Sequence, residues 1–202
     1  MTRIKLCGLS RPCDVEAANA LQPDYIGFVF APNSRRVVSC EQAQALKRLL
    51  SPQIRAVGVF VRQDLETIVS LARRGIIDVV QLHGNEPEDV VRRLRERMDK
   101  PIIQAFCIDS ERDVEAAQGS TADLLLLDSG SGTGKRFDWK QIRNIQRPYF
   151  LAGGLDPQNV GVAVRLLRPY GVDVSSGIET GGRKDREKMA AFVDAVRKED
   201  MQ

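Results

Sequence analysis

The chain repeats one pattern eight times: a short apolar segment is followed by a stretch with helical periodicity. The apolar segments are five to eight residues long, and the stretches between them place apolar residues three or four positions apart. Strands that alternate with helices form parallel sheets joined by right-handed crossovers. The apolar segments lie at residues 3–7, 25–30, 55–61, 79–83, 101–108, 123–128, 149–153 and 172–176.

Eight such units of roughly 25 residues each fit a closed barrel. The pattern therefore predicts a single (β/α)8 TIM barrel of the α/β class that spans residues 1–202 as one catalytic domain. A doubly wound open sheet is the structural alternative, but it rarely needs eight units, and the first strand lacks the GxGxxG turn of a dinucleotide fold.

The composition excludes several classes of protein. Apolar residues make up 43% of the chain and charged residues 28%, with 30 basic and 27 acidic side chains. This balance indicates no nucleic-acid surface, and no apolar run has the length of a membrane span. The segment "IKLCG" follows the start without an export leader, so we expect a cytoplasmic protein with no membrane partner. The four cysteines (7, 13, 40 and 107) show no CxxC spacing, and we expect four free thiols.

The first strand predicts which side chains enter the barrel. Side chains alternate along a strand, so Ile4 and Leu6 should face the helices while Lys5 and Cys7 point inward. Cys7 then lies at the rim formed by the carboxyl ends of the strands, where such barrels carry their chemistry. Lys5 lies deeper, and because a buried lysine alone is costly, we expect a buried ion pair or a bridged contact between it and Asp173 of the eighth strand.

A carboxylate ends the sixth strand, "DLLLLD", and the same parity places Asp128 at the rim. Cys7 and Asp128 together would supply a base and an acid across the mouth of the barrel, the pairing that proton-transfer chemistry requires. Neither residue is specific alone. A cysteine is commonly a small buried apolar residue, and an aspartate at this position can cap a helix or accept hydrogen bonds in a loop.

The last two strands end in segments suited to phosphate. The segments "LAGGLDPQNV" and "DVSSGIE" offer backbone N–H groups and hydroxyls, the first before a helix that we expect to start near Asp156 and Pro157. Loops after the last two strands are the recurrent phosphate site of this fold. Glycine turns that only start helices would give the same sequence pattern. The candidate phosphate ligands are Gly153, Gly154, Ser175, Ser176 and Gly177.

Further polar side chains can line the mouth. Arg36 follows the second strand beside Arg35, and an arginine there can hold a carboxylate with two hydrogen bonds, although most loop arginines are solvated. Gln81 and His83 share inward parity at the end of the fourth strand, so we expect them to line the substrate, although such a histidine can equally bind a loop. The glycine-rich segment 130–139 lacks GxxxxGK spacing and fits a flexible active-site loop better.

Seven segments, in this order, resemble those of the phosphoribosylanthranilate isomerases, enzymes of tryptophan biosynthesis. They extend from the first strand to the last helix, and their joint occurrence is highly specific. Two departures, Leu6 for the usual isoleucine and "GSGTG" for the commoner "GGTG", touch no proposed chemical group. The segments are "KLCGLSR", "YIGFVFAPNSRR", "VGVFV", "VVQLHGNE", "LLLLDSGSGTGKRFDW", "LAGGLDPQNV" and "VDVSSGIE" with the later "GRKDREKMAAFV".

The resemblance implies an Amadori rearrangement of N-(5′-phosphoribosyl)anthranilate to 1-(2-carboxyphenylamino)-1-deoxy-D-ribulose 5-phosphate, without cofactor or metal. It implies that Asp128 protonates the furanose ring oxygen as general acid and that Cys7 removes the C2 proton as general base. Arg36 would bind the anthranilate carboxylate, and the turns at 153–154 and 175–177 would bind the phosphate. The expected partner is this small substrate, and the expected assembly is a monomer or a homodimer.

This chemistry sets requirements on two pKa values. A thiol that acts as base near neutral pH needs a positive neighbour or a dipole to lower its pKa, so we expect one beside Cys7. An acid must keep its proton, so Asp128 needs apolar or anionic surroundings that raise its pKa.

Rival interpretations stay open. Indole-glycerol-phosphate synthase would need a lysine and a glutamate at strand ends, and the histidine-pathway sugar isomerase would show two opposed aspartates and half-barrel repetition, whereas the first strand here ends in Cys7. A non-catalytic phosphosugar-binding module would keep the glycine turns without needing Cys7 or Asp128. Turnover by the purified protein distinguishes these readings.

Overall fold

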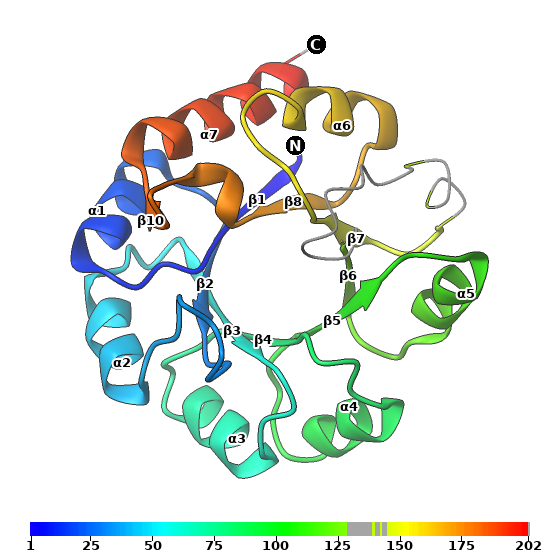
Figure 1. The fold of residues 1–202 in the computed structure, drawn as a ribbon. Coiled ribbons are helices and arrows are strands. Elements are labelled where there is room, and N and C mark those ends of the chain that lie inside the picture. Colours follow the sequence, from blue (N-terminus) through cyan, green and yellow to red (C-terminus); the bar gives the residue numbers. More distant parts are fainter. Residues whose placement is uncertain (129–138, 140–141, 143–144, 202) are drawn as a thin grey trace.

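Eight strands pair in chain order, each parallel to the next, and β8 pairs with β1 so that the sheet closes into a barrel (Figure 1). The computed structural model describes residues 1–128, 139, 142 and 145–201. The predicted (β/α)8 fold is confirmed. The strands are β1 (Arg3–Cys7), β2 (Tyr25–Val29), β3 (Arg55–Phe60), β4 (Val79–Leu82), β5 (Ile102–Cys107), β6 (Leu124–Asp128), β7 (Tyr149–Leu151) and β8 (Gly171–Val174).

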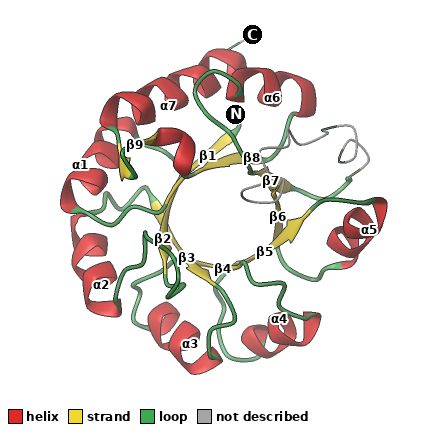
Figure 2. Ribbon diagram, viewed as in Figure 1, coloured by secondary structure: helices red, strands yellow, loops and turns green. Residues whose placement is uncertain are grey.

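Helices form a ring around the sheet (Figure 2). They bury their apolar faces in one cluster with the outward side chains of the strands. In the part of the chain that is described, no helix is long and apolar enough to cross a membrane. The helices are α1 (Pro12–Leu21), α2 (Cys40–Leu49), α3 (Leu65–Arg73), α4 (Glu88–Arg95), α5 (Glu111–Gly119), α6 (Val160–Leu167) and α7 (Arg186–Asp200).

The start of α6 differs from the prediction. It begins at Val160, not near Pro157, because the carboxylate of Asp156 accepts hydrogen bonds from the backbone N–H groups of Gln158 and Asn159 and holds them in a turn. The glycine-rich segment 130–139, apart from its last residue, and most of the short helix expected after it lie outside the described residues.

The alternation predicted for the first strand is confirmed. Ile4 and Leu6 belong to the cluster shared with the helices, whereas Lys5 is fully buried on the opposite face of the strand. Inside the barrel, side chains from β2 to β7 form a second apolar cluster. Its members are Tyr25, Val57, Val79, Ile103, Ala105, Leu126, Phe150 and Ala152.

Lys5 and Asp173 form the expected ion pair across the closure of the barrel. They are partners in the β1–β8 register, and the Nζ atom of Lys5 donates to Oδ1 of Asp173 over 2.7 Å. Burial alone would lower the pKa of Lys5, but the attraction of Asp173 and Cys7 outweighs it, so the net shift is upward. Lys5 is therefore an ammonium ion inside the barrel.

Replacing Lys5 with methionine is expected to lower the free energy of unfolding by about 3–5 kcal/mol, because it leaves the Asp173 carboxylate buried without its counter-charge. Equilibrium unfolding in urea measures the change. The double variant Lys5→Met/Asp173→Leu should recover much of the loss, since an apolar pair carries no unpaired charge. A loss below about 1 kcal/mol in the single variant, the value of an exposed ion pair, would contradict this account.

A small hairpin follows β8 and was not predicted. The chain forms a single 3-10 turn, η1 (Ser176–Ile178), and then the antiparallel strands β9 (Glu179–Thr180) and β10 (Arg183–Lys184). Gly181 and Gly182 make the turn between them, both with positive φ, which favours glycine. Glu179 and Lys184 are register partners, so the hairpin places a carboxylate beside an ammonium group next to the end of β8.

Candidate active site

Cys7 ends β1 at the rim of the barrel, with 7% of its surface exposed. It points inward: Tyr25, two residues before its register partner Gly27, belongs to the interior cluster, and a methyl group added to Gly27 would lie 2.6 Å from the sulfur atom of Cys7. The expected positive neighbours exist, in the ammonium groups of Lys5 and Lys184. Burial is the largest influence and outweighs the lowering effect of these two cations, so the net pKa of Cys7 is raised, which differs from the prediction.

Asp128 ends β6 at the same rim and is half-buried. Both predicted proton-transfer groups lie at the mouth of the barrel, because each is the last residue of a parallel strand. Around the closed sheet, β7 and β8 lie between β6 and β1. His83 follows β4, and its Nε2 atom lies 3.8 Å from Oδ2 of Asp128. The mouth therefore contains a thiol, a carboxyl group and an imidazole.

Gln81 lies inside the mouth beside His83. It is 1% exposed, and its Nε2 atom lies 2.9 Å from Nδ1 of the imidazole. Its Oε1 atom is buried and has no hydrogen-bond partner among the described residues. Buried amide oxygens are normally paired, so this atom can accept a hydrogen bond from a hydroxyl or amine of a bound molecule.

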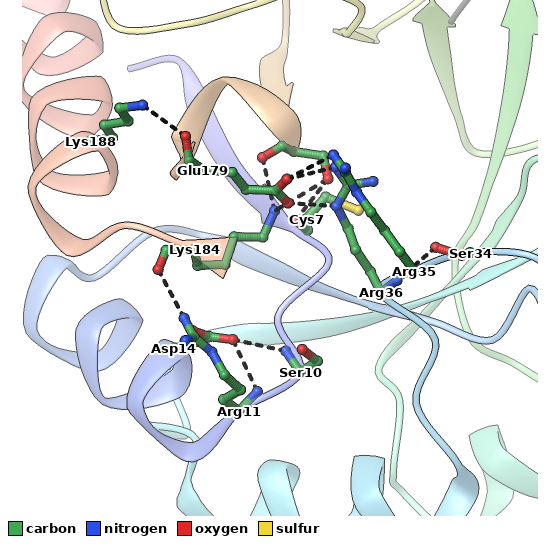
Figure 3. Close-up of polar contacts among 11 residues, drawn as sticks. Cys7, Ser10, Arg11, Asp14, Ser34, Arg35, Arg36, Glu179, Lys184 and Lys188 are labelled. Atoms are coloured by element: carbon green, nitrogen blue, oxygen red, sulfur yellow. Dashed lines mark hydrogen bonds and ion pairs between the residues drawn. The ribbon is translucent and has the colours of Figure 1, made fainter. Parts of the chain in front are cut away.

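Arg36 lies at the same end of the barrel and is held by a carboxylate (Figure 3). Its Nε atom donates to Oε1 of Glu179 over 2.5 Å, and its Nη2 atom donates to Oε2 over 2.9 Å. The aliphatic part of Arg36 lies over Gly8, where an added methyl group would be 2.5 Å from the Cδ atom. Gly8 has a φ of +79° and directly follows Cys7, so the guanidinium is held close to the thiol.

Glu179 is buried and forms ion pairs with three cations. Besides Arg36, it accepts from Lys184 over 2.7 Å and from Arg35 over 3.2 Å. Burial alone would raise the pKa of Glu179, but hydrogen bonds from Arg36 and Lys184 outweigh it and lower the pKa to about 2. Glu179 is a carboxylate at any pH near neutrality.

The two predicted phosphate loops meet. A methyl group added to Gly177 would collide with the carbonyl oxygen of Leu155, so the loop after β8 packs directly on the loop after β7. Gly153 and Gly154 both have positive φ, and Ser176 is exposed. The hydroxyl of Ser175 donates to the backbone carbonyl of Cys7 over 3.2 Å.

Glu179 and Lys184 are the site residues that our interpretation of the sequence missed. The segment "ETGGRK" carries a signal for them, since two glycines between charged residues are typical of a tight hairpin turn. All four cysteines are free thiols, as predicted. Within the described ranges, no group of three histidine, cysteine, aspartate or glutamate side chains is arranged to hold a metal ion.

Comparison with known proteins agrees with this geometry. The family model of N-(5′-phosphoribosyl)anthranilate isomerase matches residues 4–195. A curated relative of that name from Endomicrobium trichonymphae is 42% identical over 202 residues, covering 98% of this chain and 99% of the relative.

Two solved structures are similar over 98% of this chain and the whole of the other chain, each at 37% identity. One is a phosphoribosyl anthranilate isomerase in complex with reduced 1-(o-carboxyphenylamino)-1-deoxyribulose 5-phosphate, with a TM-score of 0.88. The other contains monomers generated from the dimeric enzyme of Thermotoga maritima, with a TM-score of 0.87. Family match, identity and fold agree over nearly the full length, and the chain therefore belongs to the N-(5′-phosphoribosyl)anthranilate isomerase family and is an isomerase of tryptophan biosynthesis.

Proposed function

We propose that the mouth of the barrel carries out the Amadori rearrangement of N-(5′-phosphoribosyl)anthranilate by general acid–base catalysis, with Asp128 as acid and Cys7 as base and without a cofactor. The observation that carries this proposal is the pairing of a carboxyl group and a thiol at the carboxyl ends of β6 and β1. The solved relative in complex with reduced 1-(o-carboxyphenylamino)-1-deoxyribulose 5-phosphate supports this substrate class.

The reaction needs two proton transfers at the sugar. Asp128 donates its proton to the furanose ring oxygen, the C1–O bond breaks, and the anilino nitrogen supplies the electron pair of the resulting Schiff base. Cys7 then removes the proton from C2, the electrons of that C–H bond form the C1=C2 double bond of an enolamine, and the electron pair of the C1=N double bond returns to nitrogen. Protonation at C1 and loss of the proton on the 2-hydroxyl give the ketone.

The surroundings of Cys7 fit a base that works as a thiolate. Burial disfavours the thiolate in the free enzyme, but Lys5 and Lys184 place positive charge beside it and stabilise it once it forms. Lys5 is itself fixed by Asp173, so its ammonium group does not need to reorganise during the reaction.

The other side chains suit the parts of the substrate that do not react. Arg36 would bind the anthranilate carboxylate, and Gln81 and His83 would contact the sugar, with Oε1 of Gln81 accepting a hydrogen bond. Backbone N–H groups at Gly153–Gly154 and Ser175–Gly177 would bind the phosphate. The contact between Gly177 and the Leu155 carbonyl supports this role, because it brings both loops to one place.

Turnover tests the proposal directly. Adding the purified protein to freshly made N-(5′-phosphoribosyl)anthranilate should change the fluorescence of the anthranilate group as the substrate is consumed, and the product should be the deoxyribulose phosphate. Binding without turnover would contradict the proposal and favour a phosphosugar-binding module.

Replacing Arg36 with alanine is expected to weaken binding of the carboxylate-bearing substrate by about 1.5–3 kcal/mol, the usual value of a charge-assisted contact. Titration calorimetry with the reduced product analogue measures the loss. An analogue made from aniline, which lacks the carboxylate, should lose much less. Equal losses for both analogues would contradict the role given to Arg36.

The domain organisation, the location in the cell and the assembly of the protein are also proposals. Residues 1–202 would act as one catalytic domain in the cytoplasm, where four free cysteines remain reduced. The assembly would be a monomer or a homodimer, the latter supported by the dimeric Thermotoga maritima relative.

A further inference from the structure

Glu179 uses one particular edge of the Arg36 guanidinium. An arginine offers two edges for a two-point contact with a carboxylate: one formed by Nε and Nη2, the other by Nη1 and Nη2. Glu179 takes the first edge with both of its oxygens, at 2.5 and 2.9 Å. Among the described residues, Glu179 leaves the edge formed by Nη1 and Nη2 as the one that can bind a second carboxylate.

The contacts around Glu179 hold it rigidly. Its side chain is 4% exposed. Its backbone carbonyl accepts a hydrogen bond from Lys188 of α7 over 2.8 Å, and Lys184 across the hairpin donates to its side chain. The backbone carbonyl of Lys184 in turn accepts from Arg11, the N-cap residue of α1, so the hairpin is tied to the ends of two helices (Figure 3).

Lys184 also offsets the negative charge of Glu179. Its side chain is 3% exposed, and its ammonium group donates to Ser175 as well as to Glu179. A carboxylate facing Arg36 alone would cancel the positive charge needed for an anionic substrate. With Lys184 and Arg36 both paired to one Glu179, the group keeps a net positive charge.

We propose that Glu179 is a positioning residue that fixes Arg36 so that its Nη1–Nη2 edge faces the substrate carboxylate, with Lys184 as the counter-charge that leaves the cluster of Arg36, Glu179 and Lys184 net positive. This inference rests on the proposed role of Arg36 in binding that carboxylate. It makes Glu179 a determinant of specificity for an ortho-carboxylated aniline, although Glu179 itself touches no substrate atom.

The test compares two ligands in several variants. The reduced product analogue carries the carboxylate and its aniline counterpart does not, so the ratio of their dissociation constants measures recognition of the carboxylate alone. In Glu179→Gln the ratio should fall about five- to tenfold, because an unfixed Arg36 must lose its side-chain freedom on binding. Affinity for the aniline analogue should stay within about twofold of the wild type, since it does not depend on the edge of Arg36 that binds the carboxylate.

Arg35→Gln is the matched control. Arg35 also forms an ion pair with Glu179, but its side chain is 63% exposed and Arg36 does not depend on it, so the ratio should stay within about twofold of the wild type. Glu179→Asp keeps the charge on a shorter side chain and should give an intermediate ratio. If Glu179→Gln does not fold, Glu179→Asp decides the question, and an unchanged ratio overturns the inference.

The other outcomes separate this inference from the proposed function. Suppose that the ratio of dissociation constants is unchanged in Glu179→Gln but falls strongly in Arg36→Ala. That result would overturn the positioning role of Glu179 and leave the role of Arg36 intact. Equal weakening of the binding of both ligands in Glu179→Gln would show a general structural role. A rise in the ratio would show only that Glu179 repels the substrate. Either result overturns the inference. An unchanged ratio in Arg36→Ala would overturn the role of Arg36 itself.

Discussion

Cys7→Ser is expected to lower kcat by about 10²- to 10⁴-fold, the usual contribution of a positioned general base. A serine hydroxyl occupies nearly the same space but is a far weaker acid than a thiol, so its conjugate base is hardly populated near neutral pH. Steady-state kinetics with N-(5′-phosphoribosyl)anthranilate measures the loss. Binding of the reduced product analogue should remain close to that of the wild type, since Cys7 binds no charged part of the substrate.

A substrate analogue that is already open separates this step from ring opening. It needs no acid, so its enolisation reports on the base alone, by exchange of the C2 proton with deuterated solvent. Cys7→Ser should slow this exchange as strongly as it slows turnover. Exchange at the wild-type rate would show that Cys7 only packs the rim.

Asp128→Asn is expected to lower kcat by a similar factor of about 10²–10⁴, because an amide cannot donate a proton to the ring oxygen as an acid. Asp128→Asn should slow only the reaction of the substrate whose furanose ring is still closed. The same analogue provides the comparison, since Asp128→Asn should exchange the C2 proton at close to the wild-type rate while Cys7→Ser does not. If both variants slow the exchange equally, the two roles are not divided as proposed.

The part of the site that was predictable from the sequence depends on strand parity. Lys5, Cys7 and Asp173 lie on strands whose side chains alternate, and a closed barrel makes the first and last strands neighbours. The Lys5–Asp173 pair could therefore be predicted from two positions 168 residues apart, before any distance was available.

The unpredicted part depends on contacts between loops. Glu179 reaches Arg36 only because η1 and the β9–β10 hairpin return the chain over the rim, and no periodicity in the sequence describes such a turn. The start of α6 was misplaced for a related reason, since the Asp156 side chain competes with the helix for its first N–H groups.

The shift in the pKa of Cys7 could not be predicted from the sequence either. The neighbouring charges follow from sequence parity and from the hairpin, but the direction of the shift depends on how completely the sulfur is enclosed. Enclosure is a sum over many neighbours, Gly27 among them, and no single motif encodes it.

The Lys5–Asp173 pair also sets an order of events during synthesis of the chain. Among the barrel strands the ribosome makes β1 first and β8 last, at roughly 5–20 residues per second, so the ammonium group of Lys5 waits on the order of 10–30 s for its carboxylate. During that interval, burying β1 would leave the Lys5 ammonium group without its counter-charge. The edge of β1 that later pairs with β8 stays open. The barrel can therefore close only after the eighth strand has left the ribosome.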